Sequence, residues 1–431
     1  MNKKSFSYCF ILGINHTLAK VEIINILLAN NIKFKIIEAS QETLIISSQE
    51  KIEGLKLINI SGNIAKFVEI LTVFPFKGFS RKFLEEMAQR SFGDSVLFGV
   101  SVYGSGGGAK KLNEIWRLVP RLCPEIKNSL IALGKKVRFL PPKERKLSTV
   151  SVDKNLLSKQ GLEIVLCVSQ EKIYVGKTIA VQDYESYSFR DYSRPRRDMK
   201  SGMIPPKLAK TMINLANKDK KQFFLDPFCG MGTILEELVL LGYKNIIGTD
   251  IQEKAIVDSR VNLDWLFQNY RSLEKADYHI NLKKCDVRNL SKTIFSQKID
   301  AIITEPYLGS PQLKYFNPRQ IKNETRKIES LYLDAFREFK KILSKEGVVV
   351  IVFPVFRFRN KFFYLEILDE IKRLGFKRKR FLSPTIAEST AKLLQLKITK
   401  RGSIVYYRPG QTVSREIFIF ISTRNLPLVS K

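Results

Sequence analysis

The chain has 431 residues and carries 73 Lys and Arg against 42 Asp and Glu, a formal net charge of +31. This length predicts about two to four domains, and an apolar content of 44% is ordinary for a globular protein. The excess of positive charge favours a polyanionic partner, of which nucleic acid is the commonest. An anionic membrane surface, or a Lys-rich composition of the whole organism, would produce the same charge.

Metal sites, secretion and membrane spans are not indicated. The cysteines have no C-x-x-C spacing and there are only two histidines, so neither a zinc site nor a His-based metal site is expected. The apolar run at residues 8–12 is too short for a signal peptide, and no stretch reaches the ~20 apolar residues of a membrane helix. Scattered cysteines fit a reducing compartment. We therefore expect a cytoplasmic monomer with no membrane partner.

Residues 1–65 predict a compact α+β unit. Residues 6–12 have the composition of a strand, residues 18–28 carry a helical apolar stripe, and residues 33–38 and 43–47 are two further strand candidates.

Residues 66–180 predict a second unit. Its expected elements are a helix at 83–91, a strand at 95–103, a Gly-rich loop at 104–108 followed by a basic helix, and strands at 137–140, 162–169 and 172–177. Between residues 101 and 150 there are eleven Lys and Arg against three Glu. This stretch is either a surface that faces phosphates or simply a solvated helix face.

Residues 181–200 are polar and basic and are predicted to form a linker. From 201 to 431 short apolar strands alternate with amphipathic helices, which predicts an α/β domain with a doubly wound, mostly parallel sheet. An antiparallel hairpin is expected at its end. The predicted elements are strands at 223–226, 246–250, 299–304 and 347–353, helices at 233–241, 253–267 and 327–343, and hairpin strands at 403–407 and 416–422.

The loop Asp226–Thr233 follows the first of these strands. Gly230 and Gly232 remove side chains where the strand turns into a helix, so a ligand can lie against the backbone. The loop lacks both the G-x-G-x-x-G spacing of dinucleotide sites and the G-K-[ST] of phosphate loops. A plain tight turn between strand and helix is the alternative.

Two acidic residues follow later strands, where ligands of doubly wound sheets bind. Asp250 ends its strand about 20 residues after the glycine loop, the place of a carboxylate that accepts hydrogen bonds from both ribose hydroxyls. It could equally cap the helix that follows. Asp286 could accept from an adenine amino group, although a surface Asp is common.

The segment Thr304–Gly309 ends the strand at 299–304. Glu305, Pro306 and Tyr307 place a carboxylate, a rigid proline and an aromatic ring on one loop, which suits a planar base. Acceptors that grip the N–H bonds of an exocyclic amine would localise its lone pair toward a methyl donor. The alternative is a structural turn with Glu305 in solvent.

Three segments resemble the tRNA guanosine-N2 methyltransferases of the archaeal and eukaryotic position-ten group. Residues 194–209 (RPRRDMKSGMIPPKLA) resemble that group's R-P-x-R-D-x-x-S-G-M-x-P-P-K-L-A signature, and residues 226–233 (DPFCGMGT) its D-P-F-C-G-x-G-T loop. Residues 408–411 (RPGQ) resemble its closing R-P-G-Q. Residues 66–180 resemble, more loosely, the RNA-binding THUMP domain that these enzymes carry after a small ferredoxin-like domain.

The resemblance implies a fold, a cofactor and a substrate. The fold would be a Rossmann-like, seven-stranded class I methyltransferase domain at 201–431, after a ferredoxin-like domain at 1–65, a THUMP-like domain at 66–180 and the linker. The cofactor would be S-adenosyl-L-methionine, and the partner tRNA. Members of the group differ in whether they need a small activator subunit, so that point stays open.

The resemblance also implies roles for individual residues. Glu305 and the Pro306 backbone would hold the target amine, with Tyr307 beside the base. Around the cofactor, Asp226 and the two loop glycines would surround the methionine end, Asp250 the ribose and Asp286 the adenine amino group. The full set expected to bind the cofactor is Asp226, Phe228, Gly230, Gly232, Thr233, Asp250, Ile251 and Asp286.

One segment departs from the family pattern. The family usually has D-P-P-Y after the fourth strand, where this chain has Glu305 in place of Asp and Tyr307 in place of the second Pro. Glu is one methylene longer, a shift of about the ~1 Å that can matter to catalysis. The alternatives are therefore an RNA-binding protein that keeps the fold without turnover, and a methyltransferase for ribosomal RNA or DNA adenine. Cys229 as a nucleophile is a further reading, which its place inside the cofactor loop disfavours.

Overall fold

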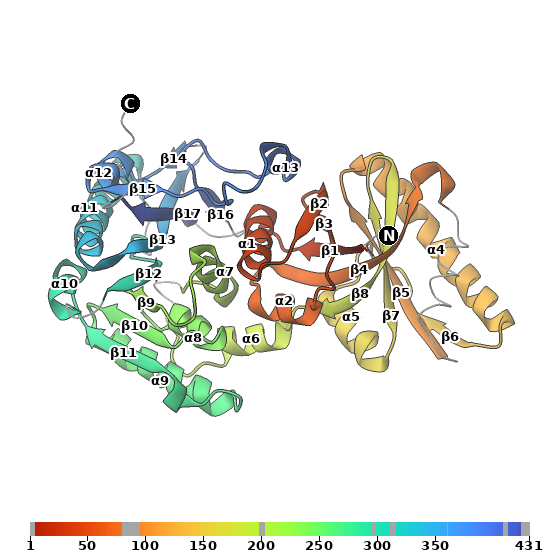
Figure 1. Ribbon diagram of the computed structural model, residues 1–431, viewed down its shortest axis with the longest axis horizontal. Helices are drawn as coiled ribbons and strands as arrows, with labels where there is room; N and C mark the ends of the chain where they lie inside the picture. The colour runs from red at the N-terminus through yellow and green to blue at the C-terminus, as the bar shows by residue number, and fades with distance from the viewer. Residues whose placement is uncertain are drawn as a thin grey trace. The chain divides into compact units, whose positions relative to one another are not determined.

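The computed structural model describes residues 5–79, 95–197, 203–294, 298–310, 316–359, 361–407 and 413–423. The chain divides into two compact units (Figure 1), one formed by Met1–Glu185 with Thr385–Leu396 and one by Ser186–Pro384 with Lys397–Lys431. The helix expected at 83–91 lies outside the described residues. None of the described helices combines the length and the apolar content that a membrane span requires.

The first unit is built on a mixed eight-stranded sheet with the order β2-β3-β1-β4-β8-β7-β5-β6. Most neighbours are antiparallel, and β5 is parallel to both β6 and β7. The strands are β1 (Phe6–Leu12), β2 (Phe34–Ala39), β3 (Thr43–Ser48), β4 (Ile64–Pro75), β5 (Ser95–Gly104), β6 (Lys136–Phe139), β7 (Leu162–Val168) and β8 (Lys172–Val181). Its helices are α1 (His16–Ala29), α2 (Gly54–Ile60), α4 (Gly108–Ala132), α5 (Thr149–Asn155) and α13 (Glu388–Leu393).

Strand β4 was not predicted, and it crosses the position of the proposed boundary between residues 65 and 66. It pairs with β1 on one side and with β8 on the other. One sheet therefore continues across that position, and the division into a ferredoxin-like domain at 1–65 and a THUMP-like domain at 66–180 stays a prediction.

Helix α4 is the basic helix that the sequence predicts after the Gly-rich loop. Its apolar residues recur on one face and are buried against β5 and β6, and several of its Lys and Arg lie on the other side. Lys110, Arg117 and Arg121 are exposed. The helix thus presents a cationic face to solvent because its apolar stripe is used by the core.

A segment from the second half of the sequence belongs to the first unit. Helix α13 packs beside β2, and the buried Lys20 of α1 donates from Nζ to the carbonyl oxygens of Ser40, at 3.1 Å, and Leu394, at 2.5 Å. A buried ammonium group needs such acceptors.

The second unit contains the sheet β11-β10-β9-β12-β13-β17-β15, with β14 paired to β13 and β16 to β17. The first five strands are parallel, and the last two run antiparallel to their neighbours. This confirms the predicted doubly wound, mostly parallel sheet with a closing hairpin; within the described residues, β14 and β16 extend the seven-strand path to nine strands. The strands are β9 (Phe223–Asp226), β10 (Asn245–Asp250), β11 (His279–Lys284), β12 (Ile299–Thr304), β13 (Leu343–Phe358), β14 (Lys361–Phe363), β15 (Phe376–Arg378), β16 (Ile404–Tyr406) and β17 (Val413–Ser422).

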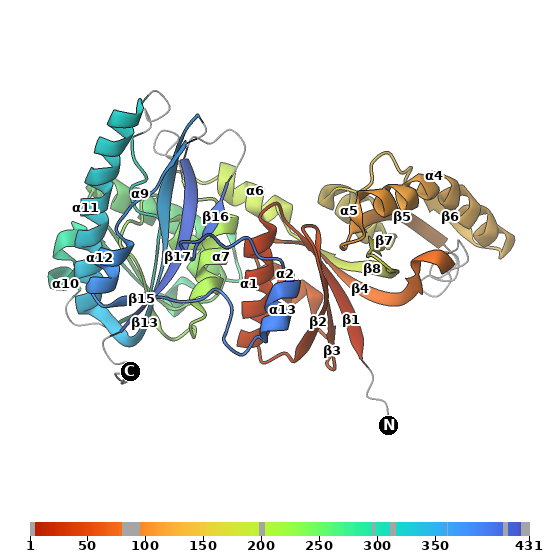
Figure 2. The same cartoon turned by 90° about the horizontal axis from the view of Figure 1, so that it is seen from above.

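Helices cover both faces of this sheet. Figure 2 shows α11 and α12 on one side and α7 on the other. The central strands are buried on both faces, as expected for parallel strands between helix layers. The helices are α6 (Tyr184–Tyr192), α7 (Pro206–Ala216), α8 (Thr233–Leu240), α9 (Glu253–Asn269), α10 (Leu290–Thr293), α11 (Pro318–Ile342) and α12 (Leu368–Arg373).

Candidate active site

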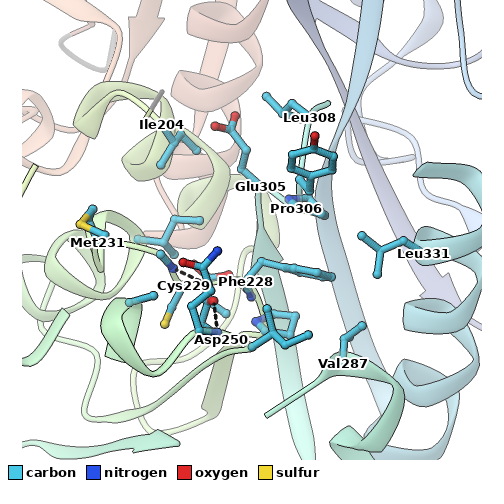
Figure 3. Close-up of a pocket in the computed structure, with 18 of the residues that line it drawn as sticks. Ile204, Phe228, Cys229, Met231, Asp250, Val287, Glu305, Pro306, Leu308 and Leu331 are labelled. Carbon is cyan, nitrogen blue, oxygen red and sulfur yellow. Dashed lines mark hydrogen bonds between the residues drawn. The ribbon is translucent and has the colours of Figure 1, made fainter. Parts of the chain in front are cut away.

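The order of the parallel strands reverses between β9 and β12, which leaves a crevice at their carboxyl ends. Ligands of open α/β sheets bind at such a switch point. A pocket of about 440 Å³ lies there, within the range of small-molecule sites. All of the predicted site residues line this pocket except Gly232. The sequence therefore located the pocket, and Figure 3 shows Asp250 and Glu305 at opposite ends of it.

The glycine loop between β9 and α8 has two glycines with different roles. Both have a positive φ, +49° at Gly230 and +84° at Gly232, a region that L side chains rarely adopt. A Cβ at Gly230 would meet nothing within 4 Å, so the open space of the pocket begins at that backbone. A Cβ at Gly232 would lie 3.1 Å from Ser259 Oγ. Gly232 is thus favoured by its positive φ and by the close approach of Ser259.

Asp226 joins β9 to β12. Its Oδ1 accepts hydrogen bonds from Thr304 Oγ1, at 2.7 Å, and from the Phe228 amide, at 3.2 Å. The side chain is buried, and burial raises the pKa of Asp226 to about 7, with the charges of Asp250 and Glu305 adding to the rise. The two hydrogen bonds oppose this shift. Near neutral pH this carboxyl can therefore change its charge.

Asp250 shapes the loop from the end of β10. Its Oδ2 accepts from the Gly230 amide at 3.1 Å, and its Oδ1 accepts from the Gln252 amide at 2.9 Å. Burial raises the pKa of Asp250, and these backbone hydrogen bonds oppose the rise. The N-cap residue of α9 is Gln252. Beside it Ile251 is 57% exposed and lines the pocket, so an apolar surface adjoins the carboxylate.

Asp286 lies beyond β11 and its carboxylate already has partners. Oδ1 accepts from the Arg288 amide at 3.0 Å, and Oδ2 accepts from Arg288 Nη1 at 3.2 Å. Arg288 also lines the pocket and donates from Nε to Asp334. The guanidinium group holds the Asp286 side chain at the rim.

Glu305, the first residue after β12, forms an ion pair that the sequence did not predict. Arg415 of β17 donates from Nε to Glu305 Oε2 at 2.5 Å and from Nη2 to Oε1 at 3.0 Å. The two side chains are 6% and 9% exposed. The alternative interpretation, in which the Glu305 side chain is solvent-exposed, is therefore wrong. Arg415 and Glu416 lie near the start of an otherwise apolar strand, which is a signal in the sequence. That signal does not identify the carboxylate that Arg415 contacts.

Tyr307 is held from two sides. Its hydroxyl donates to Glu324 Oε1 of α11 at 3.1 Å, and its carbonyl accepts from the buried Tyr332 hydroxyl at 3.3 Å. Partial burial, together with the Glu324 charge, raises the pKa of Tyr307 to about 12. The phenol therefore stays protonated and donates, while the residue as a whole is 48% exposed. Pro306 between Glu305 and Tyr307 is buried.

Cys229 lines the pocket but is not an activated nucleophile. It is 5% exposed, and burial raises the pKa of its thiol well above the ordinary value, with the nearby charges of Asp226 and Asp250 acting in the same direction. A nucleophilic cysteine needs a lowered pKa. The geometry agrees with a small side chain that closes the loop.

Polar side chains behind the loop also escaped prediction. Ser259 of α9 donates to the Gly230 carbonyl at 2.7 Å, and Asn262 donates to the Met231 carbonyl at 2.9 Å. On the other side, the fully buried Arg194 donates to Thr233 Oγ1 at 2.7 Å and pairs with Glu236. Ser259 and Asn262 are three positions apart on the buried face of a helix, which was the available signal.

Of the three segments that carry the family resemblance, only the loop Asp226–Thr233 is wholly described. Residues 198–202 of the 194–209 segment and all of residues 408–411 lie outside the described residues.

Comparison with known proteins finds methyltransferases. The UPF0020 family model, an RMKL-like methyltransferase domain, matches residues 194–372. A tRNA (guanine(10)-N2)-dimethyltransferase of Methanocaldococcus jannaschii is 27% identical over 201 residues, which are 46% of this chain and 51% of that protein. The chain thus spans about half the length of this curated relative. A probable tRNA (guanine(10)-N2)-dimethyltransferase of Methanothermococcus thermolithotrophicus is 32% identical over 33% of this chain and 77% of that protein.

Among solved structures, TrmN from Thermus thermophilus is similar in fold. It has a TM-score of 0.53 and 16% sequence identity, over 97% of this chain and 100% of that chain. Together with the strand order, this likeness shows the predicted class I methyltransferase fold in the second unit.

Proposed function

The chain belongs to the tRNA guanosine-N2 methyltransferase family, and we propose that it transfers a methyl group from S-adenosylmethionine to the 2-amino group of a tRNA guanosine. The observation that carries the proposal is the pocket with two chemically different ends. One end combines a glycine loop with Asp250, and the other places Glu305, Pro306 and Tyr307 together. A cofactor and a base could occupy the two ends side by side.

The residues at the first end fit the cofactor. Open space at Gly230 lets a ligand lie against the backbone, Asp250 offers a carboxylate for a ribose, and Ile251 offers an exposed apolar face. Asp226 and Asp250 place negative charge where a cation would be favoured, and Asp286 lies at the rim. S-adenosylmethionine, when bound, supplies an electrophilic methyl group. Phe228 and Thr233 would complete the enclosure.

The second end suits an exocyclic amine. Such an amine is a poor nucleophile because its lone pair is delocalised into the ring. The Glu305 carboxylate and the Pro306 carbonyl can each accept one N–H bond, which would direct the lone pair away from the ring. The exposed ring of Tyr307 can stack beside the base. A guanosine inside a tRNA stem would have to leave its stack to enter.

The first unit would supply RNA binding. The cationic face of α4 and the net charge of +31 suit the phosphates of tRNA, in the manner of a THUMP-like module after a ferredoxin-like one. Arg145 and Lys146 of the same stretch pair with Glu42, at 2.7 Å and 2.6 Å, which fixes the segment after β6 to the start of β3. We expect this binding in the cytoplasm, where tRNA is used.

The test is a transfer assay with a substrate panel. The protein is incubated with radiolabelled S-adenosylmethionine and unmodified tRNA, ribosomal RNA or duplex DNA, and the product is digested to nucleosides. Label in N2-methylguanosine or N2,N2-dimethylguanosine from tRNA is expected. Label in methyladenine, or only in ribosomal RNA, would assign another substrate. Tight tRNA binding without label in any nucleoside would leave an RNA-binding protein without turnover.

A further inference from the structure

The ion pair between Glu305 and Arg415 spans the sheet at the target end of the pocket. Glu305 follows β12 directly, Arg415 lies on β17, and β13 runs between these strands. Arg415 pairs in register with Pro354 of β13. Both oxygens of the carboxylate and two nitrogens of the guanidinium group take part, at 2.5 and 3.0 Å. A two-point contact fixes the plane of the carboxylate as well as its position.

The Glu305 carboxylate stabilises the positive charge of Arg415. Burial lowers the pKa of Arg415 and is the largest single influence, but the charge of Glu305, its hydrogen bond and the nearby Tyr406 together outweigh burial, so the pKa of Arg415 lies above its ordinary value. The guanidinium group is therefore a permanent positive charge. The Glu305 carboxylate is paired with this charge in a nearly dry site, where both of its oxygens act as hydrogen-bond acceptors.

The next residue of β17 provides a comparison within the same strand. Glu416 is fully buried and accepts from Arg401 Nε at 3.0 Å and from Ser403 Oγ at 2.7 Å. Successive residues of a strand point to opposite faces, so this pair and the Arg415 pair lie on different sides of the sheet. Glu305 lines the pocket, whereas Glu416 and Arg401 do not. One pair thus touches the proposed reaction site and the other serves the fold.

We propose that Arg415 is a positioning residue for methyl transfer, which holds the Glu305 carboxylate in one orientation so that it accepts the N–H of the target amine. This inference rests on the proposed function. An ionised carboxylate has about four acceptor positions, and two of them are used by Arg415. The remaining acceptor positions of Glu305 favour the amino edge of a base, which donates hydrogen bonds. A carbonyl edge would be disfavoured, because it would place one acceptor next to another.

The pair also gives the longer side chain at position 305 a physical role. A carboxylate on an aspartate would end one methylene short of the place where Arg415 holds it. Shortening residue 305 therefore separates the acceptor from its guanidinium partner without removing either charge. Replacing Arg415 by Lys keeps the positive charge and removes the two-point contact, so the two changes perturb the same link from opposite ends.

The experiment compares wild type, Arg415→Lys, Glu305→Asp and the control Arg401→Lys. We expect kcat to fall about tenfold to a hundredfold in the first two variants, as a misplacement near 1 Å would cause. The KM for tRNA, the dissociation constant of S-adenosylhomocysteine and the melting temperature should stay close to wild type. Arg401→Lys should keep its kcat. A double variant, Glu305→Gln with Arg415→Lys, should lose little more than Glu305→Gln alone.

The possible results separate the positioning role of Arg415 from the proposed function. A wild-type kcat in both Arg415→Lys and Glu305→Asp overturns the positioning role, as does a double variant whose losses multiply. Should Arg415→Lys not fold, Arg415→Gln takes its place, since it also removes the two-point contact and leaves Glu305 unchanged, and a wild-type kcat in that variant overturns the positioning role. A wild-type protein that binds tRNA but puts no label into guanosine overturns the proposed function instead. The two failures are therefore distinguishable.

Discussion

The two ends of the pocket are built in different ways. At the cofactor end, Asp250 is held by the backbone amides of Gly230 and Gln252, within 20 residues along the chain. At the target end, Glu305 is held by a side chain 110 residues away. The cofactor end therefore follows from local sequence, because a short segment supplies both the polar groups and their supports. The target end depends on partners that only the completed sheet brings together.

The largest effect is expected from changing the target end alone. Glu305→Gln keeps the shape of the side chain but removes the negative charge that faces the amine and Arg415. We expect kcat at saturating tRNA to fall by about a hundredfold to a thousandfold, the scale of losing one stabilising group in an active site. Single-turnover methyl transfer measures it.

The same variant should bind the cofactor normally, since Asp250 and the glycine loop are unchanged. Calorimetric titration with S-adenosylhomocysteine checks this. Loss of that binding in Glu305→Gln would mean that the two ends are not separable, and the comparison between them would be broken.

The reciprocal change weakens the cofactor end. Asp250→Ala removes the acceptor of two backbone amides and of the proposed ribose hydroxyls. Hydrogen bonds to a charged group are worth about 1.5–3 kcal/mol, so we expect the dissociation constant of the cofactor to rise about tenfold to a hundredfold. With saturating cofactor, kcat should remain within about threefold, as for an interaction made before the transition state.

Asp264→Ala is the matched control, because Asp264 lies on α9 and pairs with Lys275 at the surface. It should not change cofactor affinity. A kcat loss in Asp250→Ala that persists at saturating cofactor would show that the ribose end also positions the methyl group.

A smaller effect is expected from pH, through Asp226. Burial raises the pKa of this carboxyl to about 7, so its ionised fraction grows between pH 6 and 8. A positively charged cofactor should then bind about tenfold more tightly at pH 8 than at pH 6. Asp226→Asn should bind weakly and lose this dependence, which titrations at several pH values measure. Equal slopes in both proteins would assign the dependence to another group.

The raised pKa of Asp226 also makes the stability of the ligand-free protein depend on pH. The folded pKa of Asp226 lies above the value of about 3.9 expected for an unfolded chain, so the folded state holds the extra proton. The contribution of Asp226 to the free energy of unfolding therefore falls as pH rises from about 4 to about 7. Asp226→Asn should remove that part of the decline in thermal denaturation.

Much of the fold was predictable because its signals are local. The observed bounds of β9 and β12 match the predicted ones, since short apolar runs end at polar residues. Helix α11 begins at Pro318, nine residues before the predicted start at Lys327. Its first turns are polar and are stabilised by a capping box between Asn317 and Gln320, which apolar periodicity does not detect.

Two elements were hidden for other physical reasons. Helix α6 occupies Tyr184–Tyr192 within the predicted linker, and the residues that it buries are Tyr187 and Arg190. Arg190 is buried only because it pairs with Glu237 at 2.7 Å, so a polar sequence conceals a packed helix. Arg415 is similar: an arginine in a strand says nothing of a carboxylate on another strand until the order of the sheet is known.

The smallest effect is expected from the support of Tyr307. Glu324→Ala removes the acceptor of the Tyr307 hydroxyl and of the Ser310 amide, at 3.1 and 3.2 Å, but leaves the ring in place. A hydrogen bond to a carboxylate at a half-exposed site is weakened by solvent and contributes about 0.5–1.5 kcal/mol, so the KM for tRNA should rise about twofold to tenfold with kcat almost unchanged. Tyr307→Phe should match it, since it removes the same bond from the other side.

Tyr307→Ala removes the ring as well, and base stacking is worth about 1–3 kcal/mol. It should therefore raise the KM clearly more than Glu324→Ala does. If all three variants behaved alike, the hydroxyl would be what the site uses and the ring would not stack on the base. A kcat loss in Glu324→Ala comparable to that of Arg415→Lys would instead place both supports in one network, and the target end would then act as a single long-range assembly.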